Sequence, residues 1–180
     1  MRVEAIELKV DGHDFCLRNA EEADAEMLIS YLKTTCGETR YLIKEPEEIT
    51  MTLEQERKFI NTQNEADHSL MLLGFLDGEY VGNCSFMGMG PSRYLHRASM
   101  GIALFQKYTG RGLGKVMVSQ LCDIARASGI DQLELEVVTD NVRAVSLYIR
   151  QGFKACGILP DNMKYKDGTY ADVYYMVKKL

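Results

Sequence analysis

The segment with the clearest chemistry is a glycine-rich turn over residues 107–115, Lys-Tyr-Thr-Gly-Arg-Gly-Leu-Gly-Lys. It lies between a strand-like run and a helical pattern, so we expect a helix to begin near Gly112. The start of a helix presents unpaired N–H groups and the positive end of the helix dipole, and glycines let a phosphate come close. The turn therefore predicts a phosphate site, the alternative being a tight turn that binds nothing.

Two common phosphate motifs do not fit this turn. A P-loop has Ser or Thr after Gly-Lys, whereas Val116 follows here, and Thr109 occupies its first glycine position. The dinucleotide fingerprint needs its third glycine at a position that holds Lys115 or Met117. The spacing Gly-x-Gly-x-Gly therefore indicates a different kind of phosphate ligand.

A second sequence motif follows one strand later, from Asn141 to Phe153. Its pattern is Asn-x-x-Ala-x-x-Leu-Tyr-x-x-x-Gly-Phe. Together with residues 109–114, it resembles the GCN5-related N-acetyltransferase (GNAT) family, and in particular its small-amine and ribosomal-protein N-acetyltransferases. The family's acetyl-CoA motif is Arg/Gln-x-x-Gly-x-Gly/Ala, and its later motif is matched at every fixed position. The resemblance is strong over about 70–180 and weaker over 1–70, where the family varies with its acceptor.

The resemblance implies that acetyl-CoA is the co-substrate and that its acetyl group passes directly to a primary amine. Backbone N–H groups of the turn would hold the pyrophosphate, and the side chains of Arg111 and Lys115 would add positive charge. The pantetheine arm would pair with the strand before the turn, where an N–H could also polarise the thioester carbonyl. The implied cofactor-binding residues are Ile102, Ala103, Leu104, Gly110, Arg111, Gly112, Leu113, Gly114, Lys115 and Asn141.

Two side chains are predicted to transfer protons. An ammonium has no lone pair, so a base must deprotonate the amine; Glu136 is our choice because the segment resembles alanine acetyltransferases in which a Glu at this place is the base. Glu134, His96 or an ordered water are alternatives, and Glu136 could instead be an ordinary exposed strand carboxylate. Tyr148 matches the family's tyrosine acid, since a phenol with a pKa near 10 can donate to the departing thiolate. Its alternative role is packing.

The sequence departs from the family pattern at two positions. Thr109 replaces the Arg or Gln of the acetyl-CoA motif, and we expect binding to survive because backbone N–H groups do most of the holding. Ser99 stands where relatives often carry Glu, which removes one candidate base.

Hydrophobic periodicity outlines the elements that must position these residues. It predicts a single α/β domain over 1–180 with a mixed sheet, and the resemblance adds that the sheet is mostly antiparallel and flanked by helices. Residues 1–68 would form the acceptor side and residues 69–180 the acetyl-CoA-binding core. Strands are expected at 3–10, 14–18, 69–76, 80–88, 96–105, 133–137, 153–159 and 170–178, and helices at 21–35, 52–62, 112–129 and 141–152.

Composition narrows the class of protein. The 180 residues carry a net charge of −5, with 46% apolar and 26% charged residues, which is typical of a globular domain. There is no basic cluster for nucleic acid, no apolar run for a membrane span and no signal-peptide core, so we expect a cytoplasmic protein. The five dispersed cysteines predict reduced thiols, and the three histidines have no metal-ligand spacing, so no metal is expected.

The charge is divided unevenly along the chain. Residues 1–70 have a net charge of −8 and residues 71–180 of +3. This division suits an anionic cofactor in the later part and a cationic acceptor beside the earlier part, or it is scattered surface charge. The predicted acceptor is a small-molecule amine; the alternatives are a protein N-terminus or lysine, and a non-catalytic CoA-binding module. A homodimer is a family expectation.

Overall fold

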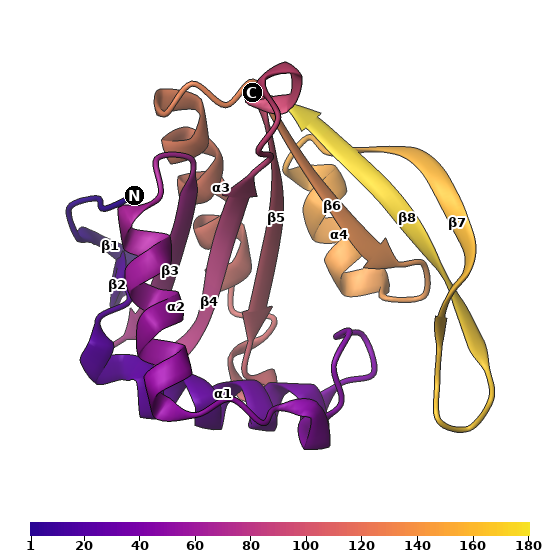
Figure 1. Ribbon diagram of the computed structural model, residues 1–180, viewed down its shortest axis with the longest axis horizontal. Helices are drawn as coiled ribbons and strands as arrows, with labels where there is room; N and C mark the ends of the chain where they lie inside the picture. The colour runs from indigo at the N-terminus through magenta and orange to yellow at the C-terminus, as the bar shows by residue number, and fades with distance from the viewer.

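All 180 residues are described by the computed structural model, which is built on one eight-stranded sheet with strand order β1-β2-β3-β4-β5-β6-β8-β7 (Figure 1). Every neighbouring pair is antiparallel except β5 and β6, which confirms the predicted mixed, mostly antiparallel α/β fold. The strands are β1 (Ile6–Val10), β2 (His13–Asn19), β3 (Ser69–Leu76), β4 (Glu79–Gly88), β5 (Arg97–Leu104), β6 (Gln132–Val138), β7 (Lys154–Lys164) and β8 (Tyr170–Lys179). The helices are α1 (Ala25–Glu38), α2 (Leu53–Glu65), α3 (Leu113–Ala127) and α4 (Val142–Arg150).

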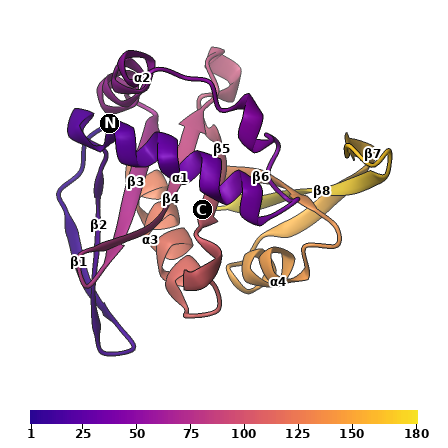
Figure 2. The same ribbon diagram turned by 90° about the horizontal axis from the view of Figure 1, so that it is seen from below.

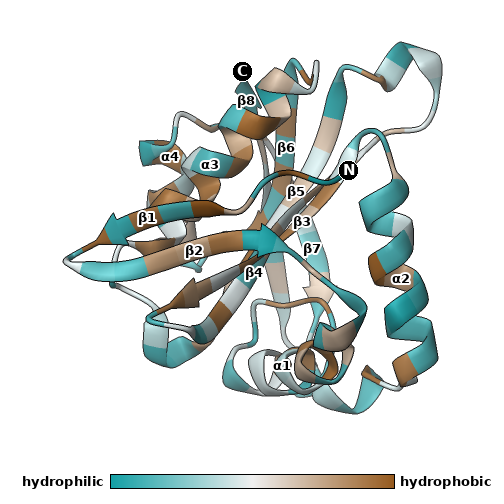
Figure 3. Cartoon of the chain, turned by 90° about the vertical axis from the view of Figure 1, so that its left-hand side faces the viewer, coloured by the Kyte–Doolittle hydropathy of each residue, from teal (hydrophilic) through white to brown (hydrophobic).

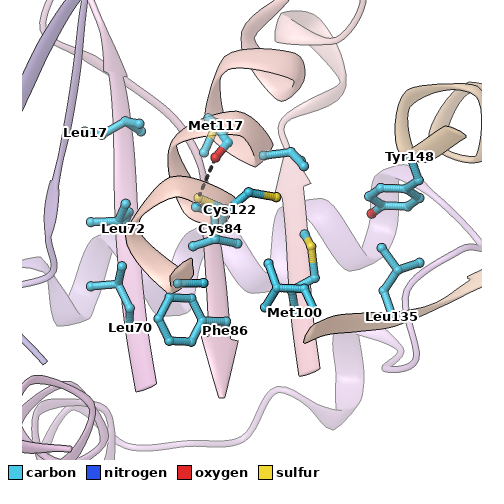
Figure 4. Close-up of a cluster of buried hydrophobic side chains, with 14 of the residues drawn as sticks. Leu17, Leu70, Leu72, Cys84, Phe86, Met100, Met117, Cys122, Leu135 and Tyr148 are labelled. Carbon is cyan, nitrogen blue, oxygen red and sulfur yellow. Dashed lines mark hydrogen bonds between the residues drawn. The ribbon is translucent and has the colours of Figure 1, made fainter. Parts of the chain in front are cut away.

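The helices cover both faces of the sheet, α1 and α2 on one side and α3 and α4 on the other (Figure 2). This arrangement explains why β3 is apolar at nearly every position rather than at every second one. Leu70 and Leu72 pack in the main core of 25 buried residues beneath α3, part of which is drawn in Figure 4. Met71 and Leu73 point to the opposite face and pack in the smaller core beneath α1 and α2.

Local sequence signals set several element boundaries. A capping box begins α2, since the Gln55 N–H donates to Thr52 Oγ1 at 3.2 Å and the Thr52 N–H donates to Gln55 Oε1 at 2.8 Å. Helix α2 is mostly hydrophilic in Figure 3, and Ile60 on its inner face is fully buried. None of the four helices has an apolar stretch of the length that a bilayer-spanning helix needs.

The feature that matters most for the site is an opening within the sheet. Strands β5 and β6 pair in parallel over three residues only, 97–99 with 132–134. Beyond them β5 stays paired with β4, and β6 with β8, so the two strands diverge (Figure 1). The backbones of the second halves of β5 and β6 are therefore not paired with each other, and the space between these two backbones is called the gap below.

The expected strand at 153–159 was too short. Strand β7 continues to Lys164 because its pairing with β8 is irregular between Leu159 and Met163 and then resumes. Pro160 lies in this irregular stretch of an edge strand, where no ladder hydrogen bond from its nitrogen is needed. The polar segment at 36–50 contains a short 3-10 turn at Pro46–Glu48, and its first residues complete α1.

Candidate active site

The glycine-rich turn joins β5 to α3 through a 3-10 turn at Gln106–Tyr108. Gly110 and Gly112 have φ angles of 81° and 80°, in the left-handed region that favours glycine. A Cβ at either position would meet nothing within 4 Å, so backbone conformation, and not crowding, requires the glycines.

The turn presents a row of free N–H groups at the start of α3. The five N–H groups from Gly110 to Gly114 have no acceptor within the protein. The Lys115 N–H, which the motif would include, instead donates to the Gly112 carbonyl at 3.1 Å. Five consecutive donors at the positive end of a helix form an arrangement that suits an anion such as a phosphate.

Gly114 explains how the turn is held against the rest of the site. A Cβ at this position would lie 3.4 Å from Leu147 Cδ2, 3.7 Å from Leu104 Cδ1 and 3.9 Å from Ile102 Cδ1. The first turn of α3 therefore rests closely on side chains from both α4 and β5. The two sequence motifs, one strand apart in the chain, meet at this point.

Beyond the three paired residues, the edge of β5 that faces the gap has no strand partner. Phe105 donates its N–H to Val81 at 3.0 Å and Arg97 accepts from the Met89 N–H at 3.2 Å, so the odd-numbered residues face β4. Alternation along the strand turns the backbone groups of Ile102 and Leu104 toward the gap. Ala103 faces the other way, and its carbonyl accepts from the Tyr31 hydroxyl at 2.8 Å. Two of the three predicted pantetheine-pairing residues therefore offer hydrogen-bonding groups to the gap.

Tyr148 lies on α4 at the other side of the gap. The side chain is 7% exposed and packs edge-to-face on Phe153, with ring centroids 5.7 Å apart. Figure 4 shows its hydroxyl turned toward the side of β5. That hydroxyl makes no hydrogen bond within the protein, and burial raises the pKa of Tyr148 to about 12. The phenol is therefore neutral at physiological pH and its proton is free to be donated.

Asn141 has a clear structural task. Its Oδ1 accepts from the Ala144 N–H at 3.2 Å and so caps α4. The predicted contact between Asn141 and the cofactor is compatible with this cap, because the amide NH₂ group is not used by it.

The two carboxylates of β6 have different surroundings. Glu134 is 2% exposed, and its Oε2 accepts from Arg97 at 2.6 Å and from Gln132 at 3.2 Å. Burial alone would raise the pKa of Glu134, but hydrogen bonds from Tyr175 and Arg97 outweigh it and hold the pKa below its ordinary value. Glu134 is thus a buried, ion-paired carboxylate and a poor base.

Glu136 is exposed, and its only partner is the Asn162 side chain, with Nδ2 and Oε2 3.4 Å apart. It lies on the divergent part of β6, next to the gap. His96, the other alternative, precedes the paired end of β5 and lies about 20 Å along the strand from Ile102. Of the residues considered as the base, Glu136 alone combines an exposed carboxylate without an ion pair with a place beside the gap.

A cavity that the sequence did not reveal adjoins this region. It has a volume of about 380 Å³ and lies between the segment after α1 and the β7–β8 hairpin. The Arg40 guanidinium lies 3.9 Å above the Tyr165 ring, and the Tyr165 hydroxyl is buried without a hydrogen-bond partner. Tyr41 ties the segment to the end of β6 through a 3.5 Å hydrogen bond to the Asp140 carbonyl. No local motif marks these residues, because two segments more than 100 residues apart in the chain build the cavity.

Comparisons with known proteins identify the class. The model of the acetyltransferase (GNAT) family matches residues 32–153, and the chain belongs to that family. A GNAT-family acetyltransferase from Streptococcus pneumoniae has a similar crystal structure, with 31% identity, a TM-score of 0.88, and coverage of 92% of this chain and 99% of that one.

Two curated relatives differ in the acceptors that their names give. The L-amino acid N-acetyltransferase of Escherichia coli is 28% identical over 110 residues, which are 59% of this chain and 66% of the relative. The N-alpha-acetyltransferase RimI of Mycobacterium tuberculosis is 31% identical over 99 residues, which are 55% of this chain and 59% of the relative. The matched regions thus span at most about two thirds of these relatives.

Proposed function

We propose that this protein transfers the acetyl group of acetyl-CoA to the primary amine of a small molecule. The observation that carries the proposal is the meeting of two features in a GNAT chain: the five free N–H groups at Gly110–Gly114 and the open edge of β5 beside Tyr148. One feature suits the phosphates of the co-substrate, and the other suits its extended amide-bearing arm.

In this proposal the chain binds acetyl-CoA mainly through its backbone. The N–H groups of Gly110 to Gly114 donate to the pyrophosphate, and the side chains of Arg111 and Lys115 add positive charge. Ile102 and Leu104 pair with the pantetheine amides as a neighbouring strand would. A β5 N–H directed into the gap then donates to the thioester oxygen as negative charge develops there.

Two side chains move the protons. Glu136 accepts a proton from the ammonium, directly or through water, which frees the nitrogen lone pair to attack the thioester carbonyl. As the new C–N bond forms and the C–S bond breaks, the Tyr148 hydroxyl donates its proton to the sulfur. The acetylated nitrogen still carries one proton more than an amide, and its transfer to the tyrosinate, directly or through water, restores Tyr148. Glu136 releases its proton to solvent, and the products are an amide and free CoA.

The cavity beside Arg40 is the proposed site of the acceptor amine. The cavity of about 380 Å³ is within the range for small-molecule sites, and the E. coli relative is named for amino acids. Arg40 makes no ion pair there, so its guanidinium could receive a carboxylate of the acceptor. The alternative acceptor is a protein N-terminus, which the RimI relative supports. A non-catalytic CoA-binding module is less consistent with a Tyr148 hydroxyl that has no hydrogen-bond partner and with the exposed carboxylate of Glu136.

The test is a thiol-release assay with acetyl-CoA and a panel of amino acids, polyamines and short peptides. The proposal predicts thiol release with at least one small amine and a matching acetylated product. If only the peptides are acetylated, the acceptor is a protein and not a small molecule. Tight binding of acetyl-CoA with no acetylated product would contradict the proposal that the protein catalyses acetyl transfer.

A further inference from the structure

An arginine without an acidic partner reaches the glycine-rich turn from α4. Arg143 is the second residue of α4, its side chain is exposed, and it forms no ion pair. Its Nη1 donates a hydrogen bond to Thr109 Oγ1, across 34 residues of sequence. The guanidinium therefore lies at the edge of the row of free N–H groups.

Thr109 fixes the direction of this contact. Its hydroxyl donates to the Gln106 carbonyl at 2.8 Å, which leaves an oxygen lone pair to accept from Arg143. A guanidinium has five N–H donors, so most of them stay available. Thr109 acts as a tether that holds a largely unused cation beside the turn.

The local geometry of α4 explains why Arg143 points this way. Leu147 follows it by four residues, so the two side chains share one face of the helix. Leu147 lies against Gly114, at 3.4 Å from where a Cβ would be. The face of α4 that carries Arg143 is therefore the face that packs on the first turn of α3.

Two other basic side chains of the turn, Lys107 and Arg111, are partly engaged elsewhere. The Lys107 ammonium and the Arg111 guanidinium lie 4.7 Å and 5.8 Å from the centroid of the Tyr108 ring. That ring is fixed because the Tyr108 hydroxyl donates to the Glu79 carboxylate. The Tyr108 ring thus lies against the cationic groups of Lys107 and Arg111, whereas the only partner of Arg143 is the neutral hydroxyl of Thr109.

We propose that Arg143 binds a phosphate group of acetyl-CoA, with Thr109 as its positioning residue. The inference rests on the proposed function and adds to it a phosphate ligand that comes from α4. It also explains how the turn can lack a basic side chain at position 109: the charge is supplied from a neighbouring helix. A guanidinium suits this role because its planar donors match phosphate oxygens.

The test is calorimetric titration of the full chain with CoA and with pantetheine, its phosphate-free fragment. We expect Arg143→Met to weaken CoA binding about tenfold, as for loss of a hydrogen bond to a charged group, and to leave pantetheine binding unchanged. Arg150→Met, at the exposed C-terminal end of α4, is the matched control and should bind CoA as the wild type does. In Arg143→Met, the second substitution Thr109→Arg should recover most of the lost affinity.

The outcomes separate this inference from the proposed function. If the wild type binds CoA and Arg143→Met binds it equally well, Arg143 is not a phosphate ligand and the proposed function stands. If Arg143→Met loses affinity for CoA and pantetheine alike, the effect is on the shape of the site, and the inference is wrong. A wild type that binds no CoA contradicts both.

Discussion

At the scale of single residues, the account depends on Tyr148 as a proton donor. Its ring packs on Phe153 through carbon atoms, so Tyr148→Phe removes the hydroxyl and keeps the packing. We expect kcat to fall about 100-fold, the lower end for a general acid, with acetyl-CoA affinity unchanged. Steady-state kinetics and calorimetry measure the two quantities, and full turnover by the variant would remove Tyr148 from the mechanism.

The pKa of Tyr148 predicts how kcat depends on pH. Because burial raises the pKa of Tyr148 to about 12, the phenol keeps its proton well above neutral pH. The wild type should therefore lose no kcat through this group between about pH 7 and pH 10.

Glu136 is the second residue on which the chemistry depends. Glu136→Gln should lower kcat/KM about 100-fold at neutral pH, because the ammonium then lacks its base. The loss should narrow as pH rises, since more of the amine is already free. The control Glu65→Gln removes an exposed carboxylate at the end of α2 and should change nothing. A deficit that stays constant across the pH range would argue for a positioning role instead.

At the scale of elements, the turn before α3 must keep its left-handed glycines. Gly112→Ala should destabilise the fold by about 1 kcal/mol and also weaken CoA binding, because the free N–H groups move with the backbone. Gly129, just after α3, has the same φ of 80° and the same open surroundings. Gly129→Ala should therefore cost similar stability in urea unfolding and leave CoA affinity intact. Equal affinity losses in both variants would mean that the turn is not the phosphate site.

An ion pair between Arg97 and Glu134 links β5 to β6 where the two strands pair. Arg97→Met leaves the Glu134 carboxylate buried without its partner, so we expect a loss of about 3 kcal/mol at pH 7. The pKa of Glu134 is lowered in the folded protein, so its stabilisation is present above the ordinary value of 4.5 and is lost as pH falls below it. The difference between wild type and variant should accordingly shrink in urea unfolding at about pH 4.

A matched control for this joint is Arg126→Met. Its pair with Asp123 joins two exposed side chains, so its loss should change stability by less than 1 kcal/mol. A similar small change for Arg97→Met would show that the buried pair does not hold the strands together.

At the scale of the whole molecule, sequence periodicity predicted the order and type of the main elements because each pattern is local. The three-residue pairing of β5 with β6 could not be predicted, since nothing in either strand encodes where parallel neighbours separate. Arg97 and Glu134 are 37 residues apart, and Arg143 and Thr109 are 34 apart. These pairs, and the cavity beside Arg40, are products of tertiary packing that motifs alone do not specify.

The most direct test of the central claim is a crystal structure of the protein with CoA. The account predicts the pyrophosphate on the N–H groups of Gly110–Gly114 and the pantetheine arm in the gap, paired with Ile102 and Leu104. The CoA sulfur should lie within hydrogen-bond reach of the Tyr148 hydroxyl. CoA bound elsewhere, or a sulfur far from Tyr148 with the gap between β5 and β6 left open, would contradict it.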